Sequence, residues 1–379
     1  MSAAPEALPG LFTPFKCRAL TTRNRFVMAP MTRYCSPNGT PTEAVVRYYH
    51  RRAQAEVGLI ISEGAGIDRP ESRAVDSVPS FCGAAALHEW GRLVAEVHAA
   101  GGRMAPQLWH VGGCADYNYP GAPHAPLVSP SGWVGAQLPG GRVMSEEDIA
   151  DTVSSYARAV RDARRLGFDA VEIHAAHGYL IDQFFWAETN RREDRYGGDT
   201  LTQRVRFAVE VIKAARREAG EDLPLILRIS QWKIAAYDTQ VARSPQELED
   251  WCGPLADAGV DIFHCSQRRF WTAEFPGSDL NFAGWVKKLT GRSTITVGSV
   301  GLTTDLFTNF ETGQGSAPNV AGLGDLVARF ERGDFDLIAV GRALLADPFW
   351  VMKVKHGRFS ELRPYDLKPY STEAMANLY

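Results

Sequence analysis

The sequence predicts an α/β fold, specifically a (β/α)₈ barrel. Eight short apolar runs rich in β-branched residues recur along the 379 residues, and stretches with helical spacing lie between them. The connections are too short for separate domains, so we expect one barrel domain over residues 1–379. A doubly wound open sheet is the less favoured alternative, because no Gly-x-Gly-x-x-Gly turn follows the first run.

The eight runs have the composition of buried parallel strands. Most are continuously apolar and do not alternate with polar residues, as expected where both faces of a sheet are covered. They span residues 24–31, 58–63, 103–109, 170–176, 223–230, 260–266, 294–300 and 337–343.

The intervening helices are indicated by periodicity and by their start signals. Apolar residues repeat at i, i+3, i+4 and i+7 over 90–97 and again over 205–212. Three starts carry an N-cap residue with a partner three positions later, which predicts capping boxes: Ser145 with Asp148, Thr200 with Gln203, and Ser244 with Glu247.

Two connections are unusual. Residues 112–144 are crowded with Gly and Pro, so a regular helix cannot begin before Ser145. A long loop after the third strand lies on the catalytic face of a barrel, where it forms either a partial lid or a solvated insertion. A second insertion, at 308–324, has no role that the sequence indicates.

The composition excludes several classes of function. Lys plus Arg is 41 and Asp plus Glu is 44, and this net charge of -3 gives no positive field for nucleic acid or an anionic membrane. No signal peptide or membrane span is recognisable, so we expect a cytoplasmic protein. The six cysteines show no metal or redox spacing and are expected to be reduced packing thiols, not ligands of an iron–sulfur cluster.

Polar residues gather where the predicted strands end, which is the catalytic face of a barrel. They are Thr32, Gln107, His174, His177, Tyr179 and Arg228. Strands seven and eight end in the turns Gly298-Ser299-Val300-Gly301 and Gly341-Arg342. Glycine lets backbone N–H groups approach a phosphate and arginine neutralises it, so the two turns favour a phosphate-bearing cofactor.

Arg228 and the two histidines each admit more than one interpretation. An arginine inside the apolar strand "LILRIS" needs an anion, either Glu172 or a cofactor that becomes anionic. His174 and His177 are structural, or ligands of a zinc ion that lacks an evident third ligand, or hydrogen-bond donors to a substrate oxygen. In the last case Tyr179 is a proton source.

Six segments in order resemble the Old Yellow Enzyme family of FMN-dependent NAD(P)H:flavin oxidoreductases. They are "NRFVMAPMTRY", "AAGGRMAPQLWHVGG", "EIHAAHGYLIDQF", "TNRREDRYGG", "LRIS" and "VGRALLADP", and they span nearly the whole chain. The resemblance implies a flavin-binding TIM barrel. It also implies FMN as cofactor and NADPH or NADH as reductant.

The resemblance assigns roles to particular residues. Residues expected to contact the flavin ring are Pro30, Met31, Thr32, Gly64, Gln107 and Arg228. Those expected at its phosphate are Gly298, Ser299, Gly301, Gly341 and Arg342. His174 and His177 would hold a carbonyl oxygen while Tyr179 protonates the α carbon, and Tyr34, Trp109, Trp232 and Trp271 would contact the substrate. No metal is expected.

The implied reaction is the reduction of an activated C=C bond. A hydride passes from the nicotinamide through flavin N5 to the β carbon of an enone, enal, nitroalkene or similar acceptor. A flavin-dependent N-methyl amine demethylase or dehydrogenase and a metal-dependent barrel hydrolase are the alternatives. The natural acceptor, the choice of nicotinamide, the family subgroup and any homo-oligomeric assembly are not indicated.

Overall fold

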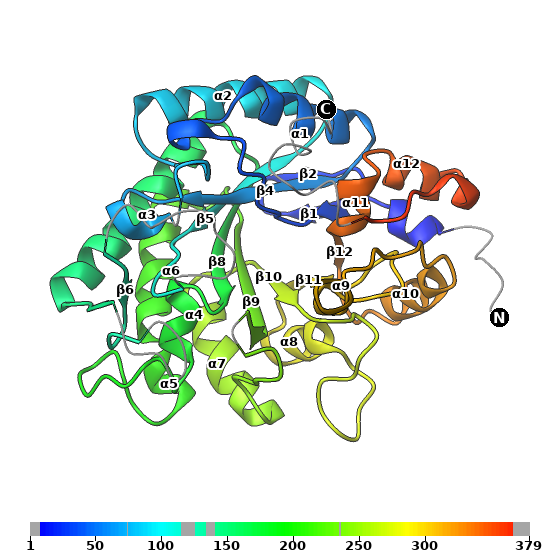
Figure 1. Ribbon diagram of the computed structural model, residues 1–379. Coiled ribbons are helices and arrows are strands. Elements are labelled where there is room, and N and C mark those ends of the chain that lie inside the picture. Colours follow the sequence, from blue (N-terminus) through cyan, green and yellow to red (C-terminus); the bar gives the residue numbers. More distant parts are fainter. Residues whose placement is uncertain (1–7, 74, 115–125, 134–140, 235, 367–379) are drawn as a thin grey trace.

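The computed structural model describes residues 8–73, 75–114, 126–133, 141–234 and 236–366. Eight parallel strands close into a barrel, and helices surround it (Figure 1). Within these ranges no helix combines the length and the apolar character needed to cross a membrane. All six cysteines are free thiols, in agreement with the sequence.

The barrel confirms the fold class and the eight expected strands. In chain order these are β3 (Phe26–Met28), β4 (Leu59–Gly66), β5 (Met104–Trp109), β8 (Val171–His177), β9 (Leu225–Lys233), β10 (Ile262–Ser266), β11 (Ser293–Val297) and β12 (Leu337–Val340). Each pairs with its neighbours in sequence, and β12 closes on β3. The first strand ends earlier than expected, since Pro30 has no N–H to donate to a neighbouring strand.

Helices connect the strands and cover the outside of the barrel. They are α1 (Glu43–Gln54), α2 (Ala84–Ala99), α3 (Glu146–Leu166), α4 (Leu180–Phe185), α5 (Leu201–Arg204), α6 (Arg206–Ala219), α7 (Pro245–Ala258), α8 (Phe282–Thr290), α9 (Leu306–Thr312), α10 (Gly322–Glu331), α11 (Arg342–Ala346) and α12 (Trp350–Lys355). Short 3₁₀ turns lie at Pro9–Phe12, Pro37–Gly39, Pro70–Ser72 and Phe359–Glu361.

Two of the three expected capping boxes are present. Ser145 with Asp148 and Thr200 with Gln203 each show both bonds of the motif. At α7 the Ser244 hydroxyl accepts from the Glu247 N–H at 3.2 Å. The Glu247 carboxylate, however, accepts from the N–H of Arg243 and not of Ser244, so the box expected there is wrong.

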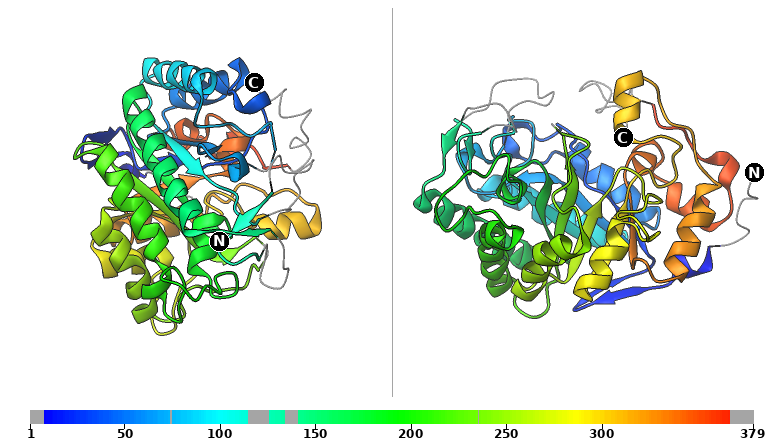
Figure 2. Two further views of the ribbon diagram at one scale, coloured as in Figure 1. Left: turned by 90° about the vertical axis from the view of Figure 1, so that its left-hand side faces the viewer. Right: turned by 90° about the horizontal axis from the view of Figure 1, so that it is seen from below.

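The amino-terminal end of the barrel is closed by a hairpin. Strands β1 (Phe15–Cys17) and β2 (Leu20–Thr22) are antiparallel, and Phe15 and Leu20 are buried in an apolar cluster with residues from the strands. On β4, Leu59 and Ile61 belong to this cluster inside the barrel, while the intervening Ile60 belongs to the larger core between the barrel and its helices. Successive side chains of a strand point to opposite faces, which explains this division. Figure 2 shows the hairpin at the end opposite α9.

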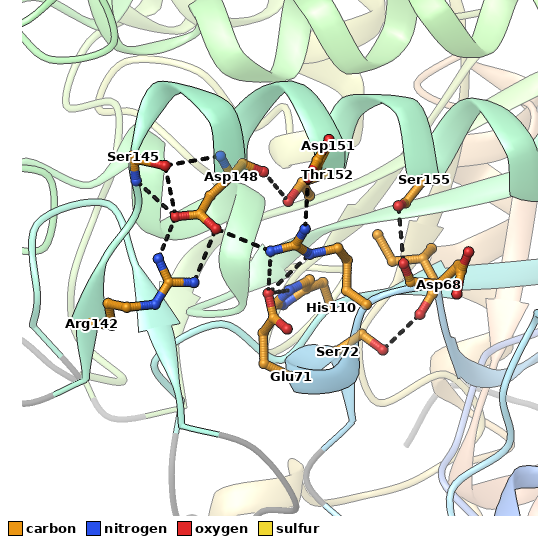
Figure 3. Close-up of polar contacts among 12 residues, drawn as sticks. Asp68, Glu71, Ser72, His110, Arg142, Ser145, Asp148, Asp151, Thr152 and Ser155 are labelled. Carbon is orange, nitrogen blue, oxygen red and sulfur yellow. Dashed lines mark hydrogen bonds and ion pairs between the residues drawn. The ribbon is translucent and has the colours of Figure 1, made fainter.

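The connection from β5 to α3 begins and ends in a polar network (Figure 3). Arg69 pairs with Glu71 at 2.8 Å and with Asp148 at 3.2 Å, and Arg142 also pairs with Asp148. His110, the residue after β5, lies 3.8 Å from Glu71. The network therefore ties the end of β5 to the first turn of α3.

Only part of that long connection is described. It includes β6 (Val128–Ser129) and β7 (Arg142–Val143), which pair in parallel, and α3 begins at Glu146 directly after the expected Ser145. Residues 115–125 and 134–140, on which the lid hypothesis mainly rests, lie outside the described residues.

Candidate active site

A cavity of about 930 Å³ opens at the carboxyl ends of the barrel strands. It has the size of a site for small molecules and cofactors. Most residues that the sequence predicts for the site line it: Pro30, Met31, Thr32, Tyr34, Gly64, Gln107, Trp109, His174, His177, Tyr179, Arg228, Trp232, Gly298, Ser299, Gly341 and Arg342.

Two predicted residues do not line the cavity. Gly301 packs so closely against Trp350 that a Cβ would lie 2.8 Å from the indole ring. Trp271 packs against Phe270, with ring centroids 5.0 Å apart, and against the main core. Neither residue is therefore placed where it would touch a molecule in the cavity.

His174 and His177 lie together at the end of β8, with ring centroids 5.1 Å apart and nearly perpendicular planes. The Nδ1 of His174 accepts from the Ala176 N–H at 3.3 Å, which leaves the proton of a neutral ring on Nε2. The Nε2 of His177 lies 2.8 Å from the Ser266 hydroxyl, which also lines the cavity.

Both imidazoles are neutral near pH 7. Burial lowers the pKa of His174 and of His177 well below the usual range, and the positive charge of Arg228 lowers both further. Neutral rings have one N–H each, so the pair offers hydrogen-bond donors without a net charge.

Tyr179 is held beside the pair by aromatic contacts. Its ring centroid lies 4.9 Å from that of His174 and 5.1 Å from that of Trp109, in edge-to-face geometry. The residue is 9% exposed and forms the N-cap position of α4. The sequence thus correctly predicts that these three proton-handling side chains meet.

A buried ion pair fixes the turn that carries these residues. His177 and Gly178 both have positive φ, 65° and 87°, which is unfavourable for the histidine. The Gly178 N–H donates to Asp182 at 2.6 Å, and Asp182 pairs with Lys233 at 2.8 Å; both side chains are fully buried. Sequence reasoning missed this pair, although a lysine three positions after the end of the expected strand was a usable signal.

Arg228 is buried without a carboxylate partner among the described residues. Its Nε has no hydrogen-bond partner there, and burial lowers its pKa while the charge of Glu172 opposes that shift. Glu172 instead accepts from Gln107 Nε2 at 2.7 Å and pairs with His264 Nδ1 at 2.6 Å. The Arg228–Glu172 salt bridge, one of the two sequence-based interpretations, is absent within the described chain.

The turns after β11 and β12 meet around Arg342. Its guanidinium donates to the Thr304 carbonyl at 2.8 Å, to the Ser299 hydroxyl at 3.3 Å and to Asn309 Oδ1. Gly298 has φ 150°, and a Cβ there would lie 2.8 Å from the Gln267 carbonyl, so only glycine fits. The result is an arginine beside close-approaching backbone, as a phosphate site requires.

Comparison with known proteins identifies the family. A model of the NADH:flavin oxidoreductase / NADH oxidase family matches residues 10–308. The chain belongs to this family, the Old Yellow Enzyme family. Its members are oxidoreductases that use a flavin and NAD(P)H.

Two curated relatives and one solved structure illustrate the similarity. The NADH oxidase of Thermoanaerobacter brockii is 31% identical over 369 residues, which cover 94% of this chain and 52% of that protein. The NADPH dehydrogenase of Bacillus subtilis (strain 168) is 30% identical over 347 residues, or 90% and 92% of the two chains. Morphinone reductase in complex with tetrahydroNAD superimposes with a TM-score of 0.78 at 26% identity, over 98% and 97%. The chain spans about half the length of the NADH oxidase.

The side chains in the cavity suit the flavin of an Old Yellow Enzyme. The Gln107 amide donates one of its two N–H groups to Glu172. Its second N–H and its carbonyl oxygen remain available for the pyrimidine edge of the ring. Gly64 leaves room beside it, since a Cβ would lie 3.3 Å from both Gln107 and Trp109. Arg228, with its unpartnered Nε, suits an anionic ring, which agrees with the other sequence-based interpretation.

The described residues do not supply the ligands that the metal alternative needs. Within the described ranges no three His, Cys, Asp or Glu side chains lie close enough together to hold a metal ion. The third ligand that a zinc site at His174 and His177 needs is therefore not found among these residues.

Several lining residues were not predicted. Ser266 ends β10, and the others come from the connections after β9, β10 and β11: Tyr237, Arg268, Phe307 and Phe310. The last two belong to α9, which overlaps the 308–324 insertion. The aromatic residues of that stretch were the only feature that could have predicted a place in the site. They show no helical or strand periodicity from which their direction could be inferred.

Proposed function

We propose that the protein is an FMN-dependent NAD(P)H ene-reductase that reduces the activated C=C bond of α,β-unsaturated carbonyl compounds or related electron-poor alkenes. The observation that carries the proposal is the pair of neutral imidazoles beside Tyr179 at the open end of the barrel.

Bound FMN would pass a hydride from the nicotinamide to the alkene. Gln107, Arg228 and Thr32 would hold its ring, and Arg342 with the Gly298 turn would hold its phosphate. Arg228 stabilises negative charge on that ring, because the guanidinium is buried and has no carboxylate partner among the described residues.

His174 and His177 polarise the carbonyl of the acceptor. The His174 Nε2–H is available, because Nδ1 is already an acceptor. Donation from the Ser266 hydroxyl to His177 Nε2 would place the proton of that ring on Nδ1, where it can face the acceptor. Two donors placed where negative charge develops on the oxygen lower the barrier to hydride addition.

Tyr179 supplies the proton. Its position next to His174 brings the phenol to the same small volume as the two donors. Protonation of the α carbon by Tyr179 completes the addition of two hydrogens across the double bond.

Flavin reduction and enone reduction can be measured separately, which tests whether the two histidines act on the acceptor alone. In the double variant His174→Ala with His177→Ala, we expect enone reduction to fall by ~10²-fold or more, while NAD(P)H still reduces the flavin in anaerobic stopped-flow measurements. The variant His174→Asn with His177→Asn keeps amide donors and should recover part of the rate. His88→Ala, at an exposed position, is the matched control.

Other outcomes would refute the proposal. Equal loss of both half-reactions in the double alanine variant would show that the histidines do not act on the acceptor. Flavin reduction by N-methyl amines, without oxidation by any enone or nitroalkene, would favour the amine dehydrogenase alternative. A purified protein that cannot take up FMN would exclude both.

A further inference from the structure

We propose that α9, the end of β9 and the loop after β9 form an aromatic wall that selects planar, ring-bearing acceptors over small linear ones. The aromatic wall is defined as Trp232, Tyr237, Phe307 and Phe310, which all line the cavity. The inference rests on the proposed ene-reductase function, because it names the acceptor class for that site.

The aromatic wall is continuous with the catalytic histidines. The Trp232 ring stacks on His177, with centroids 4.4 Å apart and an interplanar angle of 30°. Tyr237 and Phe307 pack edge-on against Trp232 at 5.3 Å and 5.7 Å. An acceptor whose carbonyl lies at the imidazoles therefore has the aromatic wall next to it.

Phe310 marks the outer edge of the wall. Its ring lies 6.3 Å from Phe307, and the residue is 58% exposed, unusually open for a phenylalanine. It also lines the cavity, which places an apolar side chain at the opening. A bound ring would cover apolar surface that otherwise faces water.

The amino-terminal end of α9 is anchored to two other loops through Asp305. Its carboxylate accepts from the Thr308 N–H at 3.0 Å, which caps the helix, and pairs with Arg269 at 2.7 Å. The Tyr237 hydroxyl lies 3.4 Å from the same carboxylate. Burial alone would raise the pKa of Asp305, but these bonds lower it overall, so the anchor is charged at neutral pH.

Tyr237 is also held from its other side. The Arg268 guanidinium carbon lies 3.4 Å from the centre of the tyrosine ring, a cation–π contact. The three loops that follow β9, β10 and β11 thus converge on one tyrosine and one aspartate. Polar contacts therefore fix the Tyr237 ring, which in turn packs against Trp232 and Phe307.

The middle of α9 is anchored to the predicted phosphate site. Asn309 is 1% exposed; it accepts from Arg342 and donates to Thr304 Oγ1 and to the Gln314 carbonyl, both at 2.9 Å. Arg342 therefore contacts both the phosphate turn and α9. Cofactor binding at Arg342 would hold Phe307 and Phe310 in place.

The chemistry of the wall explains why it favours rings. Aromatic side chains pack best against flat apolar groups, in edge-to-face or offset geometry. Trp109 and Tyr179 lie on the His174 side of the imidazole pair, while Trp232 lies on the His177 side. A planar substituent on the alkene would contact aromatic rings, whereas a methyl group would leave most of this surface uncovered.

The test compares two enones that differ only in this substituent. Benzylideneacetone and its methyl counterpart ethylideneacetone are each used to reoxidise the reduced holoenzyme under anaerobic conditions. The quantity of interest is the ratio of kcat/KM for the phenyl compound to that for the methyl compound. We expect Phe307→Ala to lower this ratio by roughly tenfold or more, and Phe307→Leu to lower it less.

Two further variants make the test specific. Phe349→Ala removes another partly exposed phenylalanine that does not line the cavity, and it should leave the ratio unchanged. Asn309→Ala keeps all four rings but removes an anchor of α9, and it should lower the ratio as well. A ratio within twofold of the wild type in both Phe307→Ala and Asn309→Ala would overturn the inference.

Failure of the proposed function gives a different result. If the wild type turns over neither enone, the ene-reductase assignment falls. The aromatic wall is then tested by binding of the two saturated ketones that correspond to the enones. Their dissociation constants are measured from the change in flavin absorbance. Loss of the preference for the phenyl ketone in Phe307→Ala supports the inference, and an equal preference in both proteins refutes it.

Discussion

The two ends of the barrel use the same strands in opposite ways. On β5, β8, β9 and β10, inward-facing side chains near the amino-terminal end are apolar, and those further along the strands are polar. The apolar set is Ala105, Ala170 (the residue directly before β8), Ile226 and Ile262, and the polar set is Gln107, Glu172, Arg228 and His264. The change takes place within two residues along the chain in each of the four cases.

The two ends also differ in whether their buried groups are satisfied within the described residues. At the amino-terminal end, Phe15 and Leu20 of the hairpin complete a close-packed apolar cluster. At the carboxyl end, Arg228 Nε and His264 Nε2 are buried and have no hydrogen-bond partner among the described residues. Unsatisfied buried groups destabilise a fold, so they are expected where a ligand supplies the missing partner.

The largest predicted effect is at the carboxyl end, in Lys233→Met. The change leaves the Asp182 carboxylate buried without its ammonium partner, so we expect the free energy of unfolding to fall by ~3–5 kcal/mol. Chemical denaturation at pH 7 measures this loss. Adding Asp182→Asn should recover much of it, because the pair is then neutral.

A matched control and a change of pH sharpen that prediction. Lys355→Met removes an exposed pair with Glu56 and should cost less than ~1 kcal/mol. Burial raises the pKa of Asp182 even in the presence of Lys233. A buried carboxyl without its partner is more stable when protonated, so the loss in Lys233→Met should shrink as the pH falls toward about 5. A loss independent of pH would show that the carboxylate is not its source.

The next effect is at the amino-terminal end. Leu20 is 1% exposed where the hairpin packs on the end of the barrel, so Leu20→Ala should lower the free energy of unfolding by ~2–5 kcal/mol through lost packing and a residual cavity. The neighbouring Thr21→Ala, on the exposed side of β2, should change it by less than ~0.5 kcal/mol. Both variants should retain the wild-type rate of flavin reduction. A slower rate in folded Leu20→Ala would show that the amino-terminal cluster also contributes to the reaction.

The smallest predicted effect concerns the charge of Arg228. In the flavin-loaded protein, Arg228→Met removes a buried positive charge and should make the reduction potential more negative. A charge-assisted hydrogen bond of ~1.5–3 kcal/mol corresponds to about 30–60 mV for two electrons. Spectroelectrochemical titration measures the shift, and Arg228→Lys should show less of it. An unchanged potential in Arg228→Met would mean that the guanidinium does not act on the flavin.

The sequence predicts the barrel and most of the site, because both follow from local patterns. Continuous apolar runs mark parallel strands, and residues at their carboxyl ends necessarily share one face. His174, His177 and Tyr179 are close in the chain and meet in space. Gln107 and Arg228 were found because polar groups in apolar strands are conspicuous.

What the sequence does not reveal are contacts between residues distant in the chain. The partner of Glu172 is His264 and not Arg228, which depends on how β8, β9 and β10 lie in register. The pairing of Asp182 with Lys233 depends on a local offset between β8 and β9. The role of α9 depends on Arg342 and Tyr237 reaching it from other loops.

The offset between β8 and β9 restricts how this enzyme can be altered. Regular pairing ends at Ala175 with Ile229, and it resumes at His177 with Lys233. Because side chains alternate along a strand, one residue added or removed between Ser230 and Lys233 would turn the ammonium group away from Asp182. Changes in loop length that reshape the acceptor pocket are therefore tolerable only beyond Lys233, and libraries for directed evolution should begin there.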